Sequence, residues 1–436
     1  MTLRTLPKTV GTLLLLQLAL PVNLALTSVA LLRSIVVKAP LATPAVAKTV
    51  LISGGKMTKS LQLARSFHAA GHRVIMIESD KYRLSGHRFS RSVDRFYTVP
   101  AAQSPDYQEA LVRIVRAEGV DVYIPVCSPV ASYYDALAKT ALSRYCEVIH
   151  CDADLIRKLD DKYEFSVLAS ALGLGVPDAH LVSAAAQIED FDFARSGAPY
   201  LLKSIPYDPV NRLDLTTLPR PTPEMTSSFA RSKPISADTP WIMQALVEGQ
   251  EYCTHSTVRN GRMQAYCCCE SSAFQINYEM VDKPEIEAWV RKFVESLNLT
   301  GQVSFDFIQA ADGSLYAIEC NPRTHSAITM FYDHPDLAGA YLTDDAPMVK
   351  PLPDSRPTYW IYHEVWRLLT QPRNVTRRLQ VILRGKDAIF DWADPLPFLM
   401  VHHVQIPWLL IKNMVAMKGW VKIDFNIGKL VESAGD

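Results

Sequence analysis

Residues 303–325, with the sequence VSFDFIQAADGSLYAIECNPRTH, constrain the fold of this chain more than any other segment. Two alternating runs flank Asp312-Gly313, and this pattern predicts a β-hairpin with a tight turn. With Asp312 and Gly313 as the loop, Ala311 faces Ser314, and this pairing sets the register of both strands. One face of the second strand is then expected to carry Leu315, Ala317, Glu319 and Asn321.

In this register, two carboxylates lie opposite one another. Asp306 on the first strand faces Glu319, and Asn321 projects from the same face as Glu319. Opposed carboxylates about 4.5–5.5 Å apart repel, so a folded protein keeps them there only when one is protonated or a cation lies between them. Two carboxylates and an amide oxygen beside phosphates suit Mg²⁺, and Arg323 can grip a phosphate past the strand end. The alternative is an ordinary exposed hairpin with a solvated acidic face.

Composition limits the class of protein. The 436 residues are enough for two or three domains with their own cores. The 45 basic and 45 acidic residues give no net charge, which argues against nucleic acid as a partner. The eight cysteines show no paired C-x-x-C spacing, so zinc is not expected. Most of the cysteines are interpreted as buried apolar residues in a reducing compartment.

An uncharged, leucine-rich run at residues 9–32 is long enough to cross a bilayer. Three interpretations stay open: a membrane anchor or interfacial helix, a helix buried against another apolar part of the chain, and a signal peptide. The internal partner would be the apolar tract 397–420, in which His402 and His403 are interpreted as structural. A membrane surface, contacted through residues 9–37, is one candidate partner.

The soluble part opens with strands and a helix in βαβ order, which is typical of a doubly wound domain. The segments are strands at residues 49–53, 74–77 and 122–126 and a helix at 59–70. Gly54-Gly55 before the helix could bind an anion, but G-x-G-x-x-G is absent, which weakens the competing hypothesis of a nucleotide-dependent oxidoreductase. Ser128 lies just past a strand, where open α/β sheets bind ligands.

The sequence Glu-Cys-Asn-Pro-Arg in the hairpin resembles the E-x-N-P-R signature of ATP-grasp ligases. This resemblance covers residues 48–332 and implies an ATP-grasp fold of mixed α/β and α+β class. A doubly wound N-terminal domain and two α+β lobes that clamp ATP are expected, with an apolar N-terminal helix before them. The implied segments are the apolar segment 1–47, the doubly wound domain 48–155, the ATP-grasp lobes 156–345 and a C-terminal region 346–436. Residues 204–220 lack the glycines of the usual phosphate flap, so no contacts are assigned there.

Carried over onto this chain, the family pattern implies a role for each matching residue. The implied catalytic residues are Arg323, Lys203 and His325, the last as a candidate base for the amine proton. The implied ATP-binding residues are Lys162, Lys203, Gln244, Ala245, Val247 and Glu251. The implied ligands of Mg²⁺, with Mn²⁺ as a substitute, are Asp306, Glu319 and Asn321. Candidate substrate residues are Ser128, His255, Ser272, Asn277 and Ser326.

Further motifs make the resemblance closer. SGGKMTK, PVCSPVASYYD, SSAFQINYE and ECNPRTHSAITMFY are similar to the mycosporine-glycine synthases, the ATP-grasp ligases of mycosporine biosynthesis. That family phosphorylates the enol oxygen of 4-deoxygadusol, a cyclohexenone, and joins glycine through its amine, giving mycosporine-glycine, ADP and phosphate. The resemblance implies an ADP-forming C–N ligase of UV-protectant synthesis, in the cytoplasm or on the cytoplasmic face of a membrane. The alternatives are an ATP-grasp ligase acting on another small acid and amino acid, and a membrane-anchored binding protein without turnover.

Overall fold

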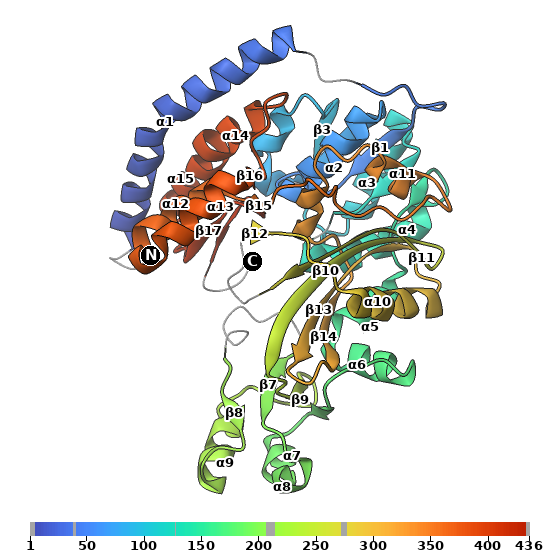
Figure 1. Ribbon diagram of the computed structural model, residues 1–436, viewed down its shortest axis with the longest axis vertical. Coiled ribbons are helices and arrows are strands. Elements are labelled where there is room, and N and C mark those ends of the chain that lie inside the picture. Colours follow the sequence, from blue (N-terminus) through green and yellow to red (C-terminus); the bar gives the residue numbers. More distant parts are fainter. Residues whose placement is uncertain (1–4, 38–40, 127, 206–213, 272–276, 433–436) are drawn as a thin grey trace.

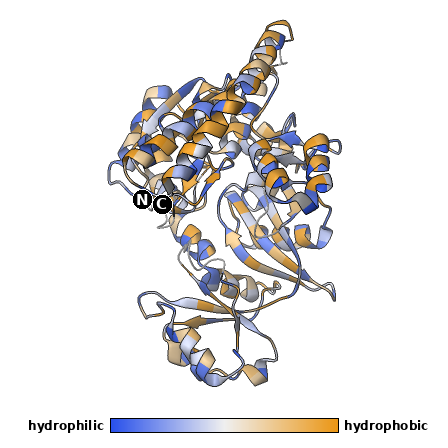
Figure 2. Cartoon of the chain, turned by 90° about the vertical axis from the view of Figure 1, so that its left-hand side faces the viewer, coloured by the Kyte–Doolittle hydropathy of each residue, from blue (hydrophilic) through white to orange (hydrophobic). Residues whose placement is uncertain are grey.

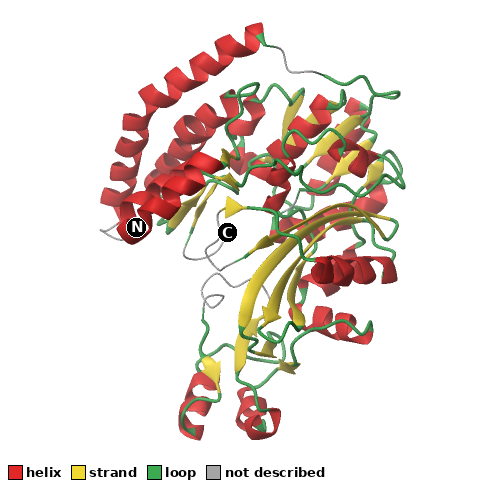
Figure 3. Cartoon of the chain, in the orientation of Figure 1, coloured by secondary structure: helices red, strands yellow, loops and turns green. Residues whose placement is uncertain are grey.

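The computed structural model describes residues 5–37, 41–126, 128–205, 214–271 and 277–432 (Figure 1). Long antiparallel strands connect a helix-rich upper body with a small lobe at the lower end (Figure 3). This arrangement is the expected one of a helix-covered N-terminal sheet followed by two antiparallel sheets.

The N-terminal domain contains a parallel five-stranded sheet of order β3-β2-β1-β4-β5. The strands are β1 (Thr49–Ile52), β2 (Arg73–Ser79), β3 (Arg95–Val99), β4 (Val122–Ile124) and β5 (Glu147–Val148), and the helices are α2 (Thr58–Ala69), α3 (Tyr107–Glu118) and α4 (Pro129–Leu142). Val50 and Ile52 face one apolar core, whereas Leu51 faces another. The sheet is therefore covered on both faces, as a parallel sheet requires.

The larger antiparallel sheet carries the hairpin from which the sequence argument began. Its order is β11-β10-β13-β14, formed by β10 (Gly249–Arg259), β11 (Arg262–Glu270), β13 (Gly301–Ala310) and β14 (Leu315–Asn321). Helix α10 (Pro284–Ser296) covers one face, and its Trp289 packs edge-on against Phe305 and Phe307 of β13. This aromatic core fixes which face of β13 is buried and which face carries Asp306.

The smaller antiparallel sheet forms the lobe at the lower end of Figure 1. Its order is β6-β9-β7-β8, formed by β6 (Ala179–Val182), β7 (Tyr200–Ser204), β8 (Thr217–Leu218) and β9 (Trp241–Ala245). The short helices α7 (Ala185–Glu189), α8 (Phe193–Ser196) and α9 (Pro223–Arg231) pack with it, and α5 (Ala153–Asp160) and α6 (Lys162–Ala171) connect this lobe to the N-terminal domain. The expected flap overlaps residues 206–213, which lie outside the described residues.

The C-terminal region folds back onto the N-terminal domain. Its helices are α12 (Ile361–Thr370), α13 (Val375–Arg384), α14 (Leu396–Met400) and α15 (Ile406–Val415), with a π-helical turn at Val401–Gln405, and α11 (Leu337–Leu342) precedes them. Its short strands are β15 (Thr358–Tyr359), β16 (Lys386–Asp387), β17 (Lys422–Asp424) and β18 (Lys429–Val431), and β15 pairs with β12 (Asn277–Tyr278) from earlier in the chain. This region shares one apolar core with the N-terminal domain, which includes Val50 and Phe67 on one side and Trp360 and Phe398 on the other.

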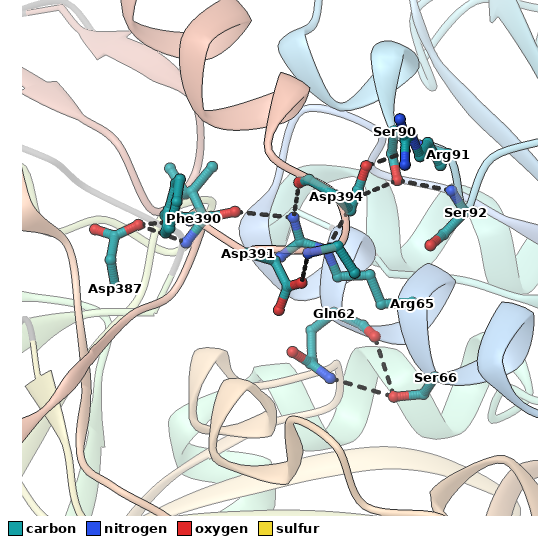
Figure 4. Close-up of polar contacts among 12 residues, drawn as sticks. Gln62, Arg65, Ser66, Ser90, Arg91, Ser92, Asp387, Phe390, Asp391 and Asp394 are labelled. Carbon is teal, nitrogen blue, oxygen red and sulfur yellow. Dashed lines mark hydrogen bonds and ion pairs between the residues drawn. The ribbon is translucent and has the colours of Figure 1, made fainter. Parts of the chain in front are cut away.

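A buried ion pair joins the C-terminal region to α2 (Figure 4). Arg65 Nε donates to Asp394 Oδ2 at 3.0 Å, and its guanidinium also donates to the Ile389 and Asp394 carbonyl oxygens at 2.9 Å. The same carboxylate accepts from Ser90 Oγ at 2.7 Å and from Arg91 N at 2.9 Å. Every polar group at this contact is thus paired, which is the condition for burying charge.

The apolar N-terminal run forms one long helix, α1 (Thr5–Val36). From Leu6 to Val36 it is the one helix in the described part of the chain that is long and apolar enough to cross a membrane. Its inner face contacts α14, α15 and the turn between them, so the expected internal partner is confirmed. His402 is buried and stacks on Tyr362 with ring centroids 4.0 Å apart, which supports a structural role.

Candidate functional site

Charged side chains from both antiparallel sheets and from α6 converge between the two sheets. Lys203 comes from β7, Asp306 from β13, Glu319 from β14 and Lys162 from the first turn of α6. Lys162 Nζ lies 3.6 Å from Glu319 Oε2. Lys203 Nζ donates to Gln244 Oε1 at 2.8 Å, and Gln244 Nε2 donates to the Ile318 carbonyl oxygen at 3.4 Å, which bridges the sheets.

The pairing of Asp306 with Glu319 is confirmed, although the expected loop is wrong. Gln309 pairs with Leu315, so the loop has three residues instead of two. It ends at Gly313, whose φ of +87° suits glycine. A β-bulge between Asp306 and Phe307 then restores the expected pairing.

The bulge also corrects the expected face of β14. Ala317 and Cys320 both pack into the core beneath α10, although they are three residues apart. Glu319 pairs with Asp306 and Ala317 pairs with Phe307, so Ile318 is the extra residue that breaks the alternation. Glu319 and Asn321 therefore turn away from that core, whereas Leu315 and Ala317 stay with it. A bulge that re-aims side chains in this way is common next to active sites.

The facing carboxylates have opposite pKa shifts. Burial, together with the charge of Glu319, raises the pKa of Asp306 to about 7. Burial also acts to raise the pKa of Glu319, but the nearby Lys162, Arg323 and Lys203 outweigh it and lower that pKa. One carboxylate is thus ionised while the other resists ionisation in the absence of a cation.

This donor set fits Mg²⁺. Asp306 and Glu319 offer carboxylate oxygen atoms on adjacent strands. Asn321 lies beside them with Nδ2 donating to Asp306 Oδ2 at 3.4 Å and Oδ1 accepting from Arg323, so its amide would have to turn over for Oδ1 to join a cation site. A divalent cation would relieve the repulsion that raises the pKa of Asp306. No group of three His, Cys, Asp or Glu side chains in the described residues could hold a metal, so the amide oxygen is part of the candidate set.

Arg323 is held beside the carboxylates by two partners. Its NH1 donates to Asp160 Oδ1 at 3.0 Å, and its NH2 donates to Asn321 Oδ1. Asp160 is the last residue of α5, so this helix positions the guanidinium at the end of β14. The geometry suits an arginine that contacts a transferred phosphate, with its planar group oriented in advance.

The loop after β14 is fixed to the N-terminal domain by buried hydrogen bonds. Ser132 Oγ of α4 donates to the Pro322 carbonyl oxygen at 3.0 Å. Thr324 Oγ1 donates to Gln302 Oε1 at 2.7 Å, and Gln302 Nε2 donates to the Pro125 carbonyl oxygen at 3.0 Å. The loop is therefore rigid where it meets the ends of the parallel strands, the edge at which such sheets bind ligands.

The structure argues against His325 as a base. Burial and the charges of Lys59 and Arg323 lower its pKa to about 3, so its imidazole is neutral near pH 7. Its Nδ1 accepts from Ala327 N at 3.3 Å, which leaves Nε2 as the protonated nitrogen. His325 can therefore donate a hydrogen bond, but it is too weak a base to take a proton from an ammonium group.

The candidate substrate residues separate into three groups. His255 is fully buried and its Nδ1 accepts from His325 N at 3.2 Å, so it supports the loop. Ser128 caps α4 by accepting from Ala131 N at 3.3 Å, which gives it a structural role. Ser326 accepts from Asn426 Nδ2 at 2.7 Å and follows the loop that carries Arg323, whereas Asn277 pairs with Tyr359 in the sheet that joins β12 to β15. Ser272 lies outside the described residues.

The expected adenine linker leaves β9 beside Lys203. The Ala245 N–H donates to the Asp178 carbonyl oxygen at 2.8 Å, so it is already used. The side chain of Gln244 is engaged by Lys203, and Val247 follows the strand end. Glu251 on β10 is exposed, and its charge acts on both Lys203 and Asp306. That proximity agrees with its expected place beside the nucleotide.

Sequence reasoning missed three residues that shape this region. Lys59 is buried in the first turn of α2, and its Nζ donates to the Thr324 carbonyl oxygen at 2.5 Å. Asp160 orients Arg323, and Asn426 reaches Ser326 from the turn between β17 and β18. For Lys59, the sequence offers one signal, which is a charged residue at the start of a helix expected to be buried. For Asp160 and Asn426, the sequence offers no comparable signal.

The seven cysteines in the described part of the chain are unsuited to act as nucleophiles. All seven described cysteines are buried and free. Burial raises the pKa of Cys146 to about 11 and that of Cys151 to about 12. Thiols of this kind stay protonated and behave as small apolar groups.

A helix-covered parallel sheet followed by two antiparallel sheets, with lysines and carboxylates between them, is the arrangement of the ATP-grasp fold. Residues 224–327 match the family model of an ATP-grasp domain. The chain therefore carries an ATP-grasp domain. No curated protein matches its sequence.

Solved structures share this fold at low sequence identity. An N5-carboxyaminoimidazole ribonucleotide synthetase in complex with ADP aligns with a TM-score of 0.56 and 15% identity, over 78% of this chain and 88% of that chain. The N5-carboxyaminoimidazole synthetase from Staphylococcus aureus, complexed with ADP, gives 0.50 and 16%, over 66% and 73%. Biotin carboxylase from Campylobacter jejuni gives 0.53 and 14%, over 68% and 72%. At this identity the likeness concerns the fold.

Proposed function

We propose that this protein is an ADP-forming ATP-grasp ligase that joins the amine of glycine to 4-deoxygadusol. The observation that carries the proposal is the Asp306–Glu319 pair, flanked by Lys162 and Arg323 and set between two antiparallel sheets. This arrangement is suited to aligning a nucleoside triphosphate and neutralising its terminal phosphates. The substrate pair comes from the sequence resemblance to mycosporine-glycine synthases.

The first step is phosphoryl transfer to an enol. The enolate oxygen of 4-deoxygadusol attacks the γ-phosphorus, an O–P bond forms, and the bond to the ADP oxygen breaks. Lys203 and Lys162 would neutralise the phosphates, and Arg323 would follow the transferred group. Mg²⁺ or Mn²⁺ held by Asp306, Glu319 and Asn321 would supply charge neutralisation. The product is a vinylogous acyl phosphate.

The second step forms the C–N bond. The glycine amine adds to the carbon that carries the phosphate, and phosphate leaves with the C–O electron pair. A proton is lost from the nitrogen, and the lowered pKa of His325 disfavours this residue as its acceptor near neutral pH. The role proposed for His325 is to donate a hydrogen bond from Nε2. Catalysis then rests on positioning and charge, because no nucleophilic side chain is required.

The cellular setting is also a proposal. We propose a cytoplasmic location, because the proposed reaction consumes ATP. The seven described cysteines are free, which fits a reducing compartment. Attachment to the cytoplasmic face of a membrane is proposed from α1, whose outer face is apolar and exposed.

The test is an incubation of the protein with ATP, Mg²⁺, glycine and 4-deoxygadusol. We expect ADP, rather than AMP, to appear together with the absorbance band of the product. Omission of glycine should prevent the new band. ADP release without a new chromophore would remove the substrate assignment and favour a ligase for another acid, and release of AMP would contradict the ADP-forming class.

A further inference from the structure

Helix α1 has two faces of opposite character. Thr9, Leu16, Asn23 and Ala30 are buried at intervals of seven residues, which places them on one side of the helix. The opposite side carries large apolar side chains in contact with solvent. They include Leu14, Leu15, Leu18, Val22, Val29 and Leu32, and Leu18 is 76% exposed. An apolar stripe of this extent is larger than soluble surfaces usually leave open.

The inner face fixes α1 to the protein along its length. Near its start, Lys8 Nζ donates to the Val421 carbonyl oxygen at 2.6 Å, and Thr9 Oγ1 accepts from Trp420 Nε1 at 2.9 Å. In the middle, Asn23 Nδ2 donates to the Tyr362 hydroxyl at 2.6 Å. Near its end, Ser34 Oγ accepts from Arg91 at 2.6 Å. A bilayer-spanning α1 would lose these contacts, so the helix has to lie along the body.

The hairpin α12–α13 beside α1 adds positive charge. Tyr362, the partner of Asn23, belongs to α12. Residues 361–384, which form this hairpin, contain five arginines and one acidic residue, although the whole chain has no net charge. The acidic residue, Glu364, is buried and paired with Arg367 at 3.2 Å and Arg378 at 3.5 Å, which joins the two helices.

The same hairpin presents apolar side chains among its arginines. Helix α13 has no buried residue, and Val375, Leu379 and Leu383 are exposed at four-residue intervals. On α12, Trp366 is 60% and Leu369 is 74% exposed. A basic amphipathic helix of this composition is typical of segments that lie in the headgroup region of a membrane. Figure 2 looks onto this side of the molecule, where hydrophobic residues recur along the helices.

We propose that α1 and the α12–α13 hairpin together form a docking surface for an anionic phospholipid bilayer, with α1 lying in the plane of the interface. The apolar stripe of α1 enters the boundary between headgroups and acyl chains, while Arg373, Arg377 and Arg384 contact lipid phosphates. The protein is thus held on one leaflet and does not cross it. This proposal does not depend on the reaction proposed above.

The test is co-sedimentation of the full-length protein with phosphatidylcholine vesicles that contain or lack phosphatidylserine. We expect binding to the anionic vesicles, weakened at least tenfold without phosphatidylserine and reduced by salt. Replacing Leu18, Val22 and Leu32 by Gln should abolish binding, because these side chains are exposed and glutamine preserves helix propensity. The Leu137→Gln variant is the apolar control, since this exposed residue lies on helix α4 of the N-terminal domain.

A second pair of variants tests the charge contribution. The double variant Arg377→Gln with Arg384→Gln should bind anionic vesicles about tenfold or more weakly. The matched double variant on α3, Arg113→Gln with Arg116→Gln, should bind as the wild type does. Ligase activity in vesicle-free solution should be unchanged in all of these variants, so this test and that of the reaction fail independently.

Three outcomes would overturn the proposal. Equal binding to neutral and anionic vesicles would refute the charge assignment. A dimer in size-exclusion chromatography that the α1 variant dissociates, without vesicle binding, would assign the stripe to a second copy of the chain. Vesicle-bound protein that resists extraction at alkaline pH would show that α1 crosses the bilayer.

Discussion

Glu319 is the residue at which a role in metal and phosphate binding can be separated from a structural role. The change to Gln keeps the shape but removes the charge that pairs with Lys162 and opposes Asp306. We expect turnover to fall by about 10²–10³-fold or more, as for loss of a main electrostatic contact. The melting temperature should stay within a few degrees, because repulsion between the carboxylates is lost together with the ion pair. Steady-state ADP release and thermal unfolding are the measurements.

The matched control is Glu295→Gln on the exposed side of α10, which removes the same charge far from the site. Its activity should equal that of the wild type. Wild-type turnover in the Glu319 variant would refute the metal role for this carboxylate.

At the residue scale, the sequence identifies groups within one motif better than groups that meet across domains. Asp306, Glu319, Asn321 and Arg323 lie within 18 residues of one another, and their pattern alone predicts that they converge. Lys59 meets the same loop from 265 positions away in the chain. No local pattern encodes such a contact, because it depends on how the loop after β14 packs onto α2.

At the scale of elements, the hairpin shows why a correct pairing can follow from an incorrect loop. Asp-Gly is compatible with a two-residue turn and with a three-residue loop that ends in a left-handed glycine. The longer loop shifts the register near Leu315, and the bulge shifts it back before Glu319. A bulge has no reliable sequence signal, so the change of face at Ile318 could not be predicted. The positions of the β7 and α10 segments, by contrast, followed from their apolar periodicity.

The contact between α2 and the C-terminal region yields a second prediction. Asp394→Ala would leave the buried Arg65 guanidinium without its carboxylate and remove the acceptor for Ser90 and Arg91. Breaking a buried ion pair in this way costs about 3–5 kcal/mol. We therefore expect the free energy of unfolding, measured with urea, to fall by that amount.

The exposed pair Arg231–Glu189 provides the comparison. Arg231→Ala should leave the free energy of unfolding nearly unchanged, because solvent screens a surface ion pair. If the Asp394 variant also leaves the free energy of unfolding nearly unchanged, the C-terminal region is not held to α2 by the ion pair.

At the scale of the whole molecule, the sequence left the environment of the N-terminal run open, and the structure confirms the interpretation in which this helix packs against another apolar part of the chain. Hydropathy reports how apolar a segment is, but not which side another element covers. The inner face of α1 packs on α14 and α15, and its outer face stays in contact with solvent. Polar residues such as Asn23 inside the run mark the packed face, because their hydrogen bonds need partners within the protein.

The stability of the whole molecule should depend on pH through two buried histidines on opposite sides of the same contact. His87 precedes β3 and His402 lies between α14 and α15; both are almost fully buried. Burial, helped at His87 by the charge of Arg65, lowers the pKa of each to about 3. Between about pH 6.5 and pH 3 the unfolded chain therefore binds more protons than the folded one, so stability rises with pH in that window.

Lowering the pH from 7 to 5 should then cost about 2 kcal/mol of unfolding free energy for each of these histidines. The His402→Gln variant loses one of the two contributions, and the drop between pH 7 and pH 5 should be smaller in this variant by about that amount. Urea unfolding of both proteins at each pH measures this drop. Because the drop is taken within each protein, a constant loss of stability caused by the substitution itself does not affect the comparison. Parallel plots of unfolding free energy against pH for the two proteins would contradict the prediction. They would mean that the imidazole of His402 becomes protonated in the folded state at pH 5, in spite of its stacking on Tyr362 and its hydrogen bond with the Phe398 carbonyl oxygen.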